Sequence, residues 1–477
     1  MEDGLTVVLD VGKTLAKLSL WDQSGTVIAR ETRPNKPFDA GAYAALDAAG
    51  IEAWAAEVLR DFAGRGPVTA IVPVAHGAAL AVLRDGRLAC PPPDYEEPVP
   101  EAVRDRYELD RDAFDLTGSP RLPLGLNLGV QLAWLEVLYP GLLDPGATVV
   151  TWAQYWAWVF SGVAATEVTS LGCHTDLWRP RDAVFSAMAV RRGWAERLAP
   201  LRRADEALGQ LRPDWVARTG LSAETKVYCG LHDSNAALLA ARGFAEISNQ
   251  ESTVLSTGTW FVAMRSPARP SDVDISALAE TRDCLVNVDA YGAPIPSARF
   301  MGGREVEILS GIDTRRIDIK LDQARLLAAV PAVLADGARA LPTFTPGVGP
   351  FPQGAGRWID MPTDPIARRA GVALYAALVA DASLDLIGAC ERIVIEGRFA
   401  EAEVFVRALA SLRPRDRIYV SNAEHDVSCG ALRLLTPSLR ALSSLTPVEP
   451  LAQDLQAYAG QWRRDAARIE AAGATGI

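Results

Sequence analysis

Two segments of this 477-residue chain share one pattern, in which an apolar run, a short glycine turn and a second apolar run follow one another. The first is "LTVVLDVGKTLAKLSLW" at 5–21, and the second is "STVLSTGTWFVAM" at 252–264. The first, continued by "TVIAR" at 26–30, predicts a three-stranded meander whose first strand is buried on both faces, and the second has the form of its opening hairpin. A pattern that returns in the second half indicates a duplicated architecture. We therefore predict two α/β domains, 1–243 and 244–477, as the length also favours.

The first turn contains Gly12-Lys13-Thr14, a triplet that also ends a P-loop. A P-loop needs a glycine five positions before Gly12, and that position is Val7. The apolar run also enters the turn without a glycine-rich loop. The P-loop interpretation is therefore excluded, and a hairpin turn remains.

The segments between and after the hairpins alternate between helical and strand patterns. Residues 39–66 predict a long alanine-rich helix with a glycine stop, and 67–77 predict a strand that ends at His76. Residues 90–125 indicate an irregular excursion, and 265–300 a polar segment. In the second half we expect helix, strand, helix and strand at 363–390, 392–397, 400–412 and 417–421.

Composition excludes several classes of protein. The net charge is −11 and no basic tract is present, which argues against a nucleic-acid partner. No apolar run is long enough to predict a membrane span, and the acidic N-terminus does not resemble a signal peptide. The six cysteines form no C-x-x-C pair, which argues against a zinc site and predicts a cytoplasmic protein.

The two glycine turns are candidates for phosphate binding. Glycine lets a backbone approach a phosphate closely, and turn amides form a concavity that suits anions. Threonine hydroxyls and a lysine ammonium group add further donors. The candidate residues are Gly12, Lys13, Thr14, Thr257, Gly258 and Thr259.

Three further residues are candidates for chemistry, and each has an alternative structural interpretation. Asp10 ends the first predicted strand, where it suits a Mg²⁺ ion or, alternatively, caps a turn. Asp233 in "CGLHDSNAALLA" lies at a helix start, as a general base or an N-cap. His76 follows a strand, where α/β proteins bind ligands, although a lone histidine is more often a core or surface residue. His174 and Asp176 are weaker candidates.

The same segments, in this order, resemble the FGGY family of carbohydrate kinases over nearly the whole chain. "LDVGKT" resembles the first phosphate motif of the family, "VAHGAALAVL" its sugar-contacting segment and "GLHDSNAAL" its catalytic Gly-x-x-Asp loop. "VQLAWL" and "TWAQYWAWVFSGVAATEVTSLGCHTDLW" are similar to its signature helix and the stretch that follows. "LSTGTW" resembles the second phosphate turn, and "VIEGRFAEAEVFVRALASL" the adenosine-binding segment.

This resemblance implies an α/β fold of two duplicated actin-like (ribonuclease H-like) domains with ATP and sugar in the cleft between them. It implies that Asp233 is the base that deprotonates a sugar hydroxyl and that Asp10 is the carboxylate on the Mg²⁺ side. It places Gly397 by the adenosine. The residues that it places at the sugar are His76, Asn127 and Ser234, together with Asp233.

The chain departs from the family pattern at three positions. Lys13 stands where the family usually has threonine, Gln131 replaces the lysine of the signature helix, and Arg398 replaces a glycine after Gly397. A side chain at position 398 is expected to narrow the adenine pocket. Arg304 in "FMGGREVEIL" is expected either to face the cleft or to lie in a surface turn.

The leading hypothesis is an ATP- and Mg²⁺-dependent sugar kinase. By resemblance alone, it favours a ketose of the rhamnulose, fuculose or ribulose type. One alternative is a non-catalytic actin-like sensor of sugar or nucleotide, against which the presence of both Asp10 and Asp233 argues. Another is an ATPase or an enzyme that forms an acyl phosphate. The oligomeric state stays open, with a homodimer among the options.

Overall fold

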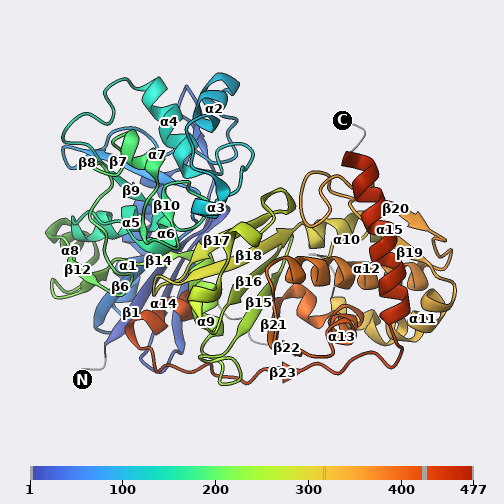
Figure 1. Ribbon diagram of the computed structural model, residues 1–477. Helices are drawn as coiled ribbons and strands as arrows, with labels where there is room; N and C mark the ends of the chain where they lie inside the picture. Colours follow the sequence, from blue (N-terminus) through green and yellow to red (C-terminus); the bar gives the residue numbers. More distant parts are fainter. Residues whose placement is uncertain (1–3, 315, 317, 422–426, 475–477) are drawn as a thin grey trace. The chain divides into compact units, whose positions relative to one another are not determined.

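The computed structural model describes residues 4–314, 316, 318–421 and 427–474 (Figure 1). The chain forms two compact units, and the break after Gly243 coincides with the predicted domain boundary. Two later segments depart from that division. Residues 286–294 fold with the N-terminal unit, where the Val286 amide donates to the Gly118 carbonyl. The described part of 425–442 also folds there, because helix α14 (Val427–Leu435) packs against helix α9 (Asp233–Ala241).

The N-terminal unit is built on a sheet with strand order β12-β13-β6-β1-β2-β3, in which β14 also pairs with β6. The predicted hairpin is confirmed as an antiparallel meander of three strands, followed by parallel pairing of β1 with β6. The bounds are β1 Leu5–Val11, β2 Leu15–Trp21, β3 Val27–Pro34, β6 Val68–Ala75, β12 Ala207–Gln210, β13 Lys226–Tyr228 and β14 Leu231–His232.

Helices cover both faces of this sheet. Val7 and Leu9 of β1 pack with α1 (Ala48–Ala63), α5 (Trp152–Ser161) and α8 (Pro213–Thr219), whereas Val8 packs with α9 and α14. This arrangement explains why β1 is a continuous apolar run. The side chains of Trp152, Tyr155, Trp156 and Val159 in α5, spaced at i, i+3, i+4 and i+7, all lie in this core.

A second layer of short elements completes the N-terminal unit around its own apolar cluster. It contains a three-stranded sheet of order β8-β7-β9 and helices that include α4, whose residues are almost all buried. Its elements are β7 Leu80–Arg84, β8 Arg87–Leu88, β9 Thr148–Thr151, β10 Trp178–Arg179, β11 Val184–Phe185, α2 Glu101–Glu108, α3 Phe114–Thr117, α4 Leu128–Leu138, α6 Val168–Leu171 and α7 Ala187–Arg191.

The C-terminal unit is built on a sheet with strand order β17-β18-β16-β15-β21-β22-β23. Its core packs α11, α12 and α13 against the sheet, and Trp462 of α15 joins the same cluster. The strands are β15 Ser252–Thr257, β16 Phe261–Ser266, β17 Cys284–Val288, β18 Pro294–Phe300, β21 Arg392–Gly397, β22 Arg417–Val420 and β23 Thr446–Pro447. The helices are α10 Gly302–Ser310, α11 Gln323–Ala335, α12 Pro365–Leu386, α13 Glu403–Leu412 and α15 Gln456–Ala474, with 3-10 turns η4 at Ile319–Asp322 and η5 at Arg398–Glu401.

The duplication predicted from the two hairpins is present in the topology. In both sheets an antiparallel meander (β3-β2-β1 and β18-β16-β15) is followed by parallel strands (β6 and β13, β21 and β22). Val11 lies opposite Ala75 in the first sheet, and Thr257 lies opposite Gly397 in the second. The fold class predicted from the sequence is therefore confirmed as two α/β units of one design.

Four local predictions need correction. Residues 90–125, expected to be irregular, contain helices α2 and α3. The helix expected at 39–66 is shorter, because Asp47 caps α1 by accepting from the Gly50 amide, and residues 38–45 form a small hairpin (β4 Phe38–Asp39, β5 Ala44–Ala45). The polar segment at 265–300 contains strands β17 and β18. The glycine-rich segment at 302–310 is helix α10 and not a surface turn.

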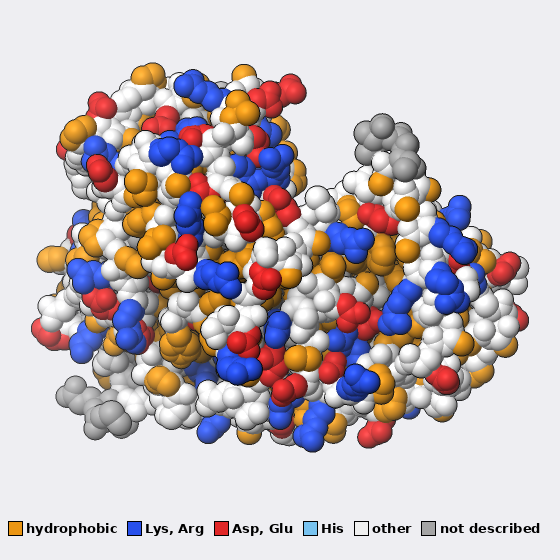
Figure 2. Space-filling view, viewed as in Figure 1, with side chains coloured by type: hydrophobic (Ala, Val, Ile, Leu, Met, Phe, Trp, Pro, Cys, Tyr) orange, Lys and Arg blue, Asp and Glu red, His pale blue; other side chains and the backbone are white. Residues whose placement is uncertain are grey.

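None of the helices within the described ranges is long and apolar enough to cross a bilayer. On the face shown in Figure 2, basic and acidic side chains are interspersed.

Candidate functional site

Three parallel strands of the N-terminal unit end at one edge of its sheet. Asp10 of β1 and Leu231 of β14 both lie opposite Val74 of β6. The chain therefore leaves these strands at Gly12, His76 and Asp233, side by side at their carboxyl ends. Ligands of open α/β sheets bind at such an edge, so the register assembles the predicted sugar-side and phosphate-side residues of this unit.

Asp233 is the first residue of α9, and the N-cap position is taken by His232. The N-cap interpretation of Asp233 is therefore wrong for this helix. One oxygen, Oδ1, accepts from the Ser234 amide at 2.6 Å and from the Ser234 hydroxyl at 3.3 Å. Burial raises the pKa of Asp233 to about 6, although these two hydrogen bonds oppose the rise. A carboxylate with this pKa is a stronger base than an ordinary aspartate.

His232 holds Asp233 from the other side. Its Nε2 lies 3.1 Å from Oδ1 of Asp233, and its Nδ1 lies 3.3 Å from the side-chain amide of Asn235. Burial lowers the pKa of His232 to about 4, so the ring is neutral at pH 7 and its Nε2–H donates to the carboxylate. The His232 amide donates to the Thr169 hydroxyl at 2.9 Å, which anchors the loop to α6.

His76 is buried and keeps one polar atom without a hydrogen-bond partner, Nδ1. Its ring meets Tyr95 edge-on at 5.5 Å between centroids, and Trp152 lies 6.5 Å away. Burial, together with His232, Lys13 and His174, lowers the pKa of His76 to about 3. A neutral imidazole with an unused nitrogen in such a place is suited to a hydroxyl of a ligand.

Lys13 is bound by acidic residues from a distant segment. Its Nζ makes ion pairs with Asp94 and, at 3.3 Å, with Glu96, and it lies 4.8 Å from the centre of the Tyr95 ring. The side chains of Lys13 and Asp94 are only 16% and 3% exposed. Lys13 therefore faces the segment that packs on His76.

Asp10 is buried at the edge and accepts from Lys17 Nζ at 3.1 Å. Within the described ranges, no group of three or more histidine, cysteine and acidic side chains could hold a metal ion. One carboxylate beside phosphate oxygens and water still fits Mg²⁺, which retains several waters when proteins bind it. The donor set thus suits a magnesium ion delivered with a nucleotide and not a site made by protein alone.

Asn127 and Gln131 use their polar groups within the fold. The Asn127 side chain accepts from the Leu122 amide, and its Nδ2 lies 3.0–3.2 Å from Ser119, Pro120 and His174 oxygens. Gln131, fully buried in α4, donates to the carbonyl groups of Ala78 and Gly125. Both side chains therefore fix the loops around the edge of the sheet.

In the C-terminal unit, the second turn lies at the carboxyl ends of β15 and β21. The Thr257 hydroxyl donates to the Glu396 carbonyl and accepts from the Phe399 amide at 3.1 Å, whereas Thr259 is exposed. Gly397 has a φ of +82°, and a Cβ there would lie 2.3 Å from the Thr257 carbonyl oxygen. Glycine is therefore required where this strand passes the turn. Burial raises the pKa of the Glu396 carboxyl to about 7.

Helix α10 begins against the same turn. A Cβ at Gly303 would lie 2.0 Å from the Gly258 carbonyl oxygen, and the Arg304 amide lies 3.4 Å from the Thr259 carbonyl. The Arg304 side chain is 54% exposed and pairs with Glu307 at 3.7 Å. The start of a helix thus brings backbone amides to the second glycine turn.

Arg398 is held away from the Gly397 backbone by a hydrogen bond from Nη1 to the Thr314 hydroxyl at 2.9 Å. Thr314 and Phe399 line an apolar pocket between α10, α11, α12 and α13. In this pocket Gln323 donates to the Ile319 carbonyl, and its Oε1 is buried without a hydrogen-bond partner. The pocket thus has a largely apolar lining near Phe399, to which the hydroxyl groups of Ser310 and Thr314 and the side chain of Arg369 add polar groups.

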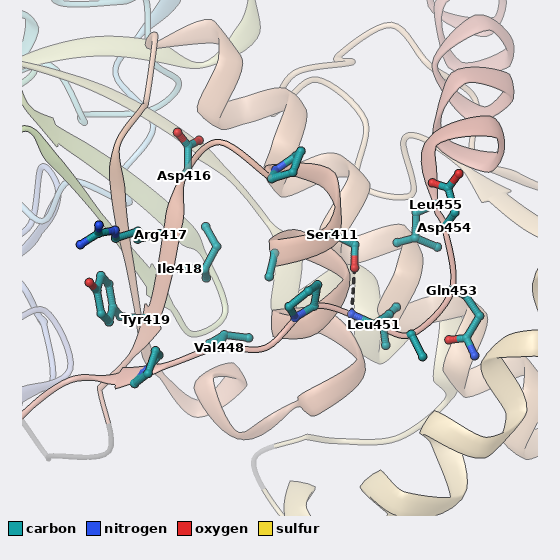
Figure 3. A pocket seen from close by; sticks show the side chains of 15 residues that line it. Ser411, Asp416, Arg417, Ile418, Tyr419, Val448, Leu451, Gln453, Asp454 and Leu455 are labelled. Carbon is teal, nitrogen blue, oxygen red and sulfur yellow. Dashed lines mark hydrogen bonds between the residues drawn. The ribbon is translucent and has the colours of Figure 1, made fainter.

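A groove of about 570 Å³ lies elsewhere on the C-terminal unit (Figure 3). It is lined by β22, β23, the end of α13 and residues 450–455, and the Leu451 amide donates to the Ser411 hydroxyl across it. None of the predicted site residues lines this groove. Its volume is therefore no reason to place the active site there.

Sequence reasoning missed Asp94, Tyr95, His232 and Glu396. His232 directly precedes Asp233 in the sequence. This adjacency was the signal from which its contact with the Asp233 carboxylate could have been predicted. Asp94 and Tyr95 lie in the proline-rich excursion "CPPPDYEEPVP", where the local pattern carries no sign of a contact with Lys13.

Comparisons with known proteins find similarity to carbohydrate kinases. The family model for the C-terminal domain of FGGY carbohydrate kinases matches residues 249–443. The chain is similar to a carbohydrate kinase from Novosphingobium aromaticivorans, at 57% identity with a TM-score of 0.93 over 96% of this chain and 100% of that one. It is 26% identical to L-fuculokinase of Salmonella typhi over 73% of this chain and 72% of the relative. Xylulose kinase from Rhodospirillum rubrum shares the fold, at a TM-score of 0.77 and 19% identity over 98% of each chain.

Proposed function

Because the chain belongs to the FGGY family of carbohydrate kinases, it is a phosphotransferase that acts on a sugar, and we propose that Asp233 is its general base. The observation that carries this proposal is the register of β1, β6 and β14, which brings Asp10, His76 and Asp233 to one edge of the sheet. The pKa of Asp233, raised to about 6, suits a base at neutral pH.

In the proposed reaction, Asp233 accepts the proton of a sugar hydroxyl group. The oxygen of that hydroxyl attacks the γ-phosphorus of ATP, and ADP leaves. His232 and Ser234 both donate to Oδ1 of Asp233. Oδ2 is therefore the oxygen that we assign to proton transfer. The neutral His232 cannot compete for that proton, because its pKa is about 4.

We propose that the two glycine turns, Asp10 and Mg²⁺ serve the phosphates. The Gly12 amide donates to the Leu15 carbonyl, and the Gly258 amide donates to the Trp260 carbonyl. Both amides are therefore used within their own turns. Phosphate contacts therefore fall to Thr14 and Thr259, while the glycines let the phosphates approach. Thr257 supports its turn from beneath. A bound Mg²⁺ would supply positive charge to the phosphates, and the Asp10 carboxylate would hold it.

We propose that the nucleotide base occupies the apolar pocket beside Gly397. Its largely apolar walls, which include Phe399 and Phe405, suit an aromatic ring. Because Arg398 is bonded to Thr314, the side chain at this position shapes the pocket without filling it.

For the sugar, we propose a ketose of the fuculose, rhamnulose or ribulose type. The similarity to L-fuculokinase supports this class. His76 and Ser234 are the proposed sugar contacts. Asn127, whose amide is occupied by the loops, acts in this proposal by holding those loops in place.

An assay of ADP release over a panel of ketoses, aldoses and polyols tests this proposal. We expect release that depends on one class of ketose and that falls by roughly 10²–10⁴-fold in Asp233→Asn. ADP release that needs no sugar, or that Asp233→Asn leaves unchanged, contradicts the mechanism. We place the reaction in the cytoplasm, in keeping with six cysteines that form no disulfide.

A further inference from the structure

Lys13 lies in the first glycine turn, the proposed phosphate turn, but its side chain contacts the segment that borders His76. Its Nζ binds Asp94 and Glu96 and lies over the face of Tyr95. All three partners come from a segment more than 80 residues away along the chain. This contact joins the turn after β1 to the loop that borders His76.

Asp94 cannot release Lys13 easily. Its side chain is 3% exposed, and its Oδ1 also accepts from the Glu96 amide at 2.9 Å. If the ammonium group moved to a phosphate, a buried carboxylate would lose its counter-ion, which is strongly unfavourable. Lys13 is therefore expected to stay on Asp94 when a nucleotide binds.

The position of Tyr95 depends on this ion pair. Its ring packs edge-on against His76 on one side and beneath the Lys13 ammonium group on the other. Asp94 and Glu96 flank Tyr95 in sequence. The two ion pairs with Lys13 therefore hold the backbone on both sides of Tyr95 and so fix the position of its ring. A small cavity lined by Lys13, His76, Asp94 and Trp152 lies beside these groups.

We propose that Lys13 is a positioning residue of the sugar site, which holds Tyr95 against His76 and so sets sugar affinity and not nucleotide affinity. This inference rests on the proposed function, in which His76 contacts the sugar. It explains why this chain has lysine at position 13, where the family usually has threonine: the lysine serves recognition of the sugar. A lysine that served the phosphates would give the opposite kinetic result.

The test is steady-state kinetics of Lys13→Thr with the sugar that the wild-type protein phosphorylates. We expect the KM for sugar to rise about 10- to 100-fold, as for removal of one partner of a buried ion pair, while the KM for ATP stays within about twofold. Lys13→Arg keeps the charge and should recover most of the affinity. Lys226→Thr, at an exposed position of the same unit, is the matched control and should leave both constants unchanged.

Tyr95→Leu provides a second route that leaves the ion pairs in place. It should raise the KM for sugar in the same way, and the double variant should be no worse than the more affected single one, because both act through one ring. A rise in the KM for ATP in Lys13→Thr, or additive effects in the double variant, overturns the inference while the proposed function stands. Wild-type protein that neither phosphorylates nor binds any sugar of the panel, by calorimetry, overturns the proposed function and the inference with it.

Discussion

Asp233→Asn should stabilise the protein at neutral pH while it lowers the rate of catalysis by roughly 10²–10⁴-fold. Asparagine keeps the Oδ1 acceptor that His232 and Ser234 use in the native site, so the geometry is retained and only the charge is lost. Burial raises the pKa of Asp233 from 3.8 to about 6, a shift of roughly two pH units and about 3 kcal/mol. Because the side chain is 28% exposed, about 3 kcal/mol is an upper limit.

The sign follows from linkage. The folded-state pKa lies above the unfolded one, so this group's contribution is most favourable when both states are protonated, below about pH 4. This contribution to stability is lost as the pH rises from about 4 through 6, because between these values Asp233 ionises in the unfolded chain but stays largely protonated in the folded protein. Asparagine does not ionise, so the variant escapes this loss.

Thermal unfolding of both proteins at pH 4.5 and 7.5 measures the effect. We expect the midpoint of Asp233→Asn to exceed that of the wild-type protein by up to about 6 °C at pH 7.5 and by much less at pH 4.5. Asp205→Asn is the control, because Arg203 lowers the pKa of that carboxyl and its loss should not stabilise the protein. A midpoint difference independent of pH, or a less stable Asp233→Asn at pH 7.5, refutes the reasoning.

Four further substitutions test individual contacts. Asp10→Asn should lower kcat by at least about 100-fold and raise the Mg²⁺ concentration for half-maximal ADP release; an unchanged Mg²⁺ dependence counts against its role. Gly397→Ala, at a φ of +82° and 2.3 Å from a carbonyl oxygen, should lower the free energy of unfolding by about 1–3 kcal/mol in urea titration, and an unchanged midpoint would contradict this. Thr257→Val leaves the Phe399 amide without its acceptor and should cost about 1–3 kcal/mol in the same titration, so full stability would be a surprise. Asn127→Ala, which removes the acceptor of the Leu122 amide, should destabilise by a similar amount and raise the KM for sugar; a change in the KM for ATP alone speaks against it.

The sequence determined the elements whose pattern is local. The two hairpins, their glycine turns and the strands that end at His76 and Gly397 were predicted from apolar runs and turn residues, and the structure contains them. The start of α1 was misplaced, because the Asp47 cap and the short hairpin before it depend on few residues. Strands β17 and β18 were missed in a segment whose polar residues hid their pattern.

Only the tertiary structure decided which partners the site residues take. The pattern around Gly12-Lys13-Thr14 indicated phosphate, yet Lys13 is paired with Asp94, 81 residues further along the chain. Asn127, which the family resemblance places at the sugar, has its amide nitrogen bonded to the Pro120 and His174 carbonyl groups. The physical reason is the same in both cases. Local spacing specifies strands and turns, whereas a buried charge or amide is satisfied by whichever group the folded chain brings within hydrogen-bond distance.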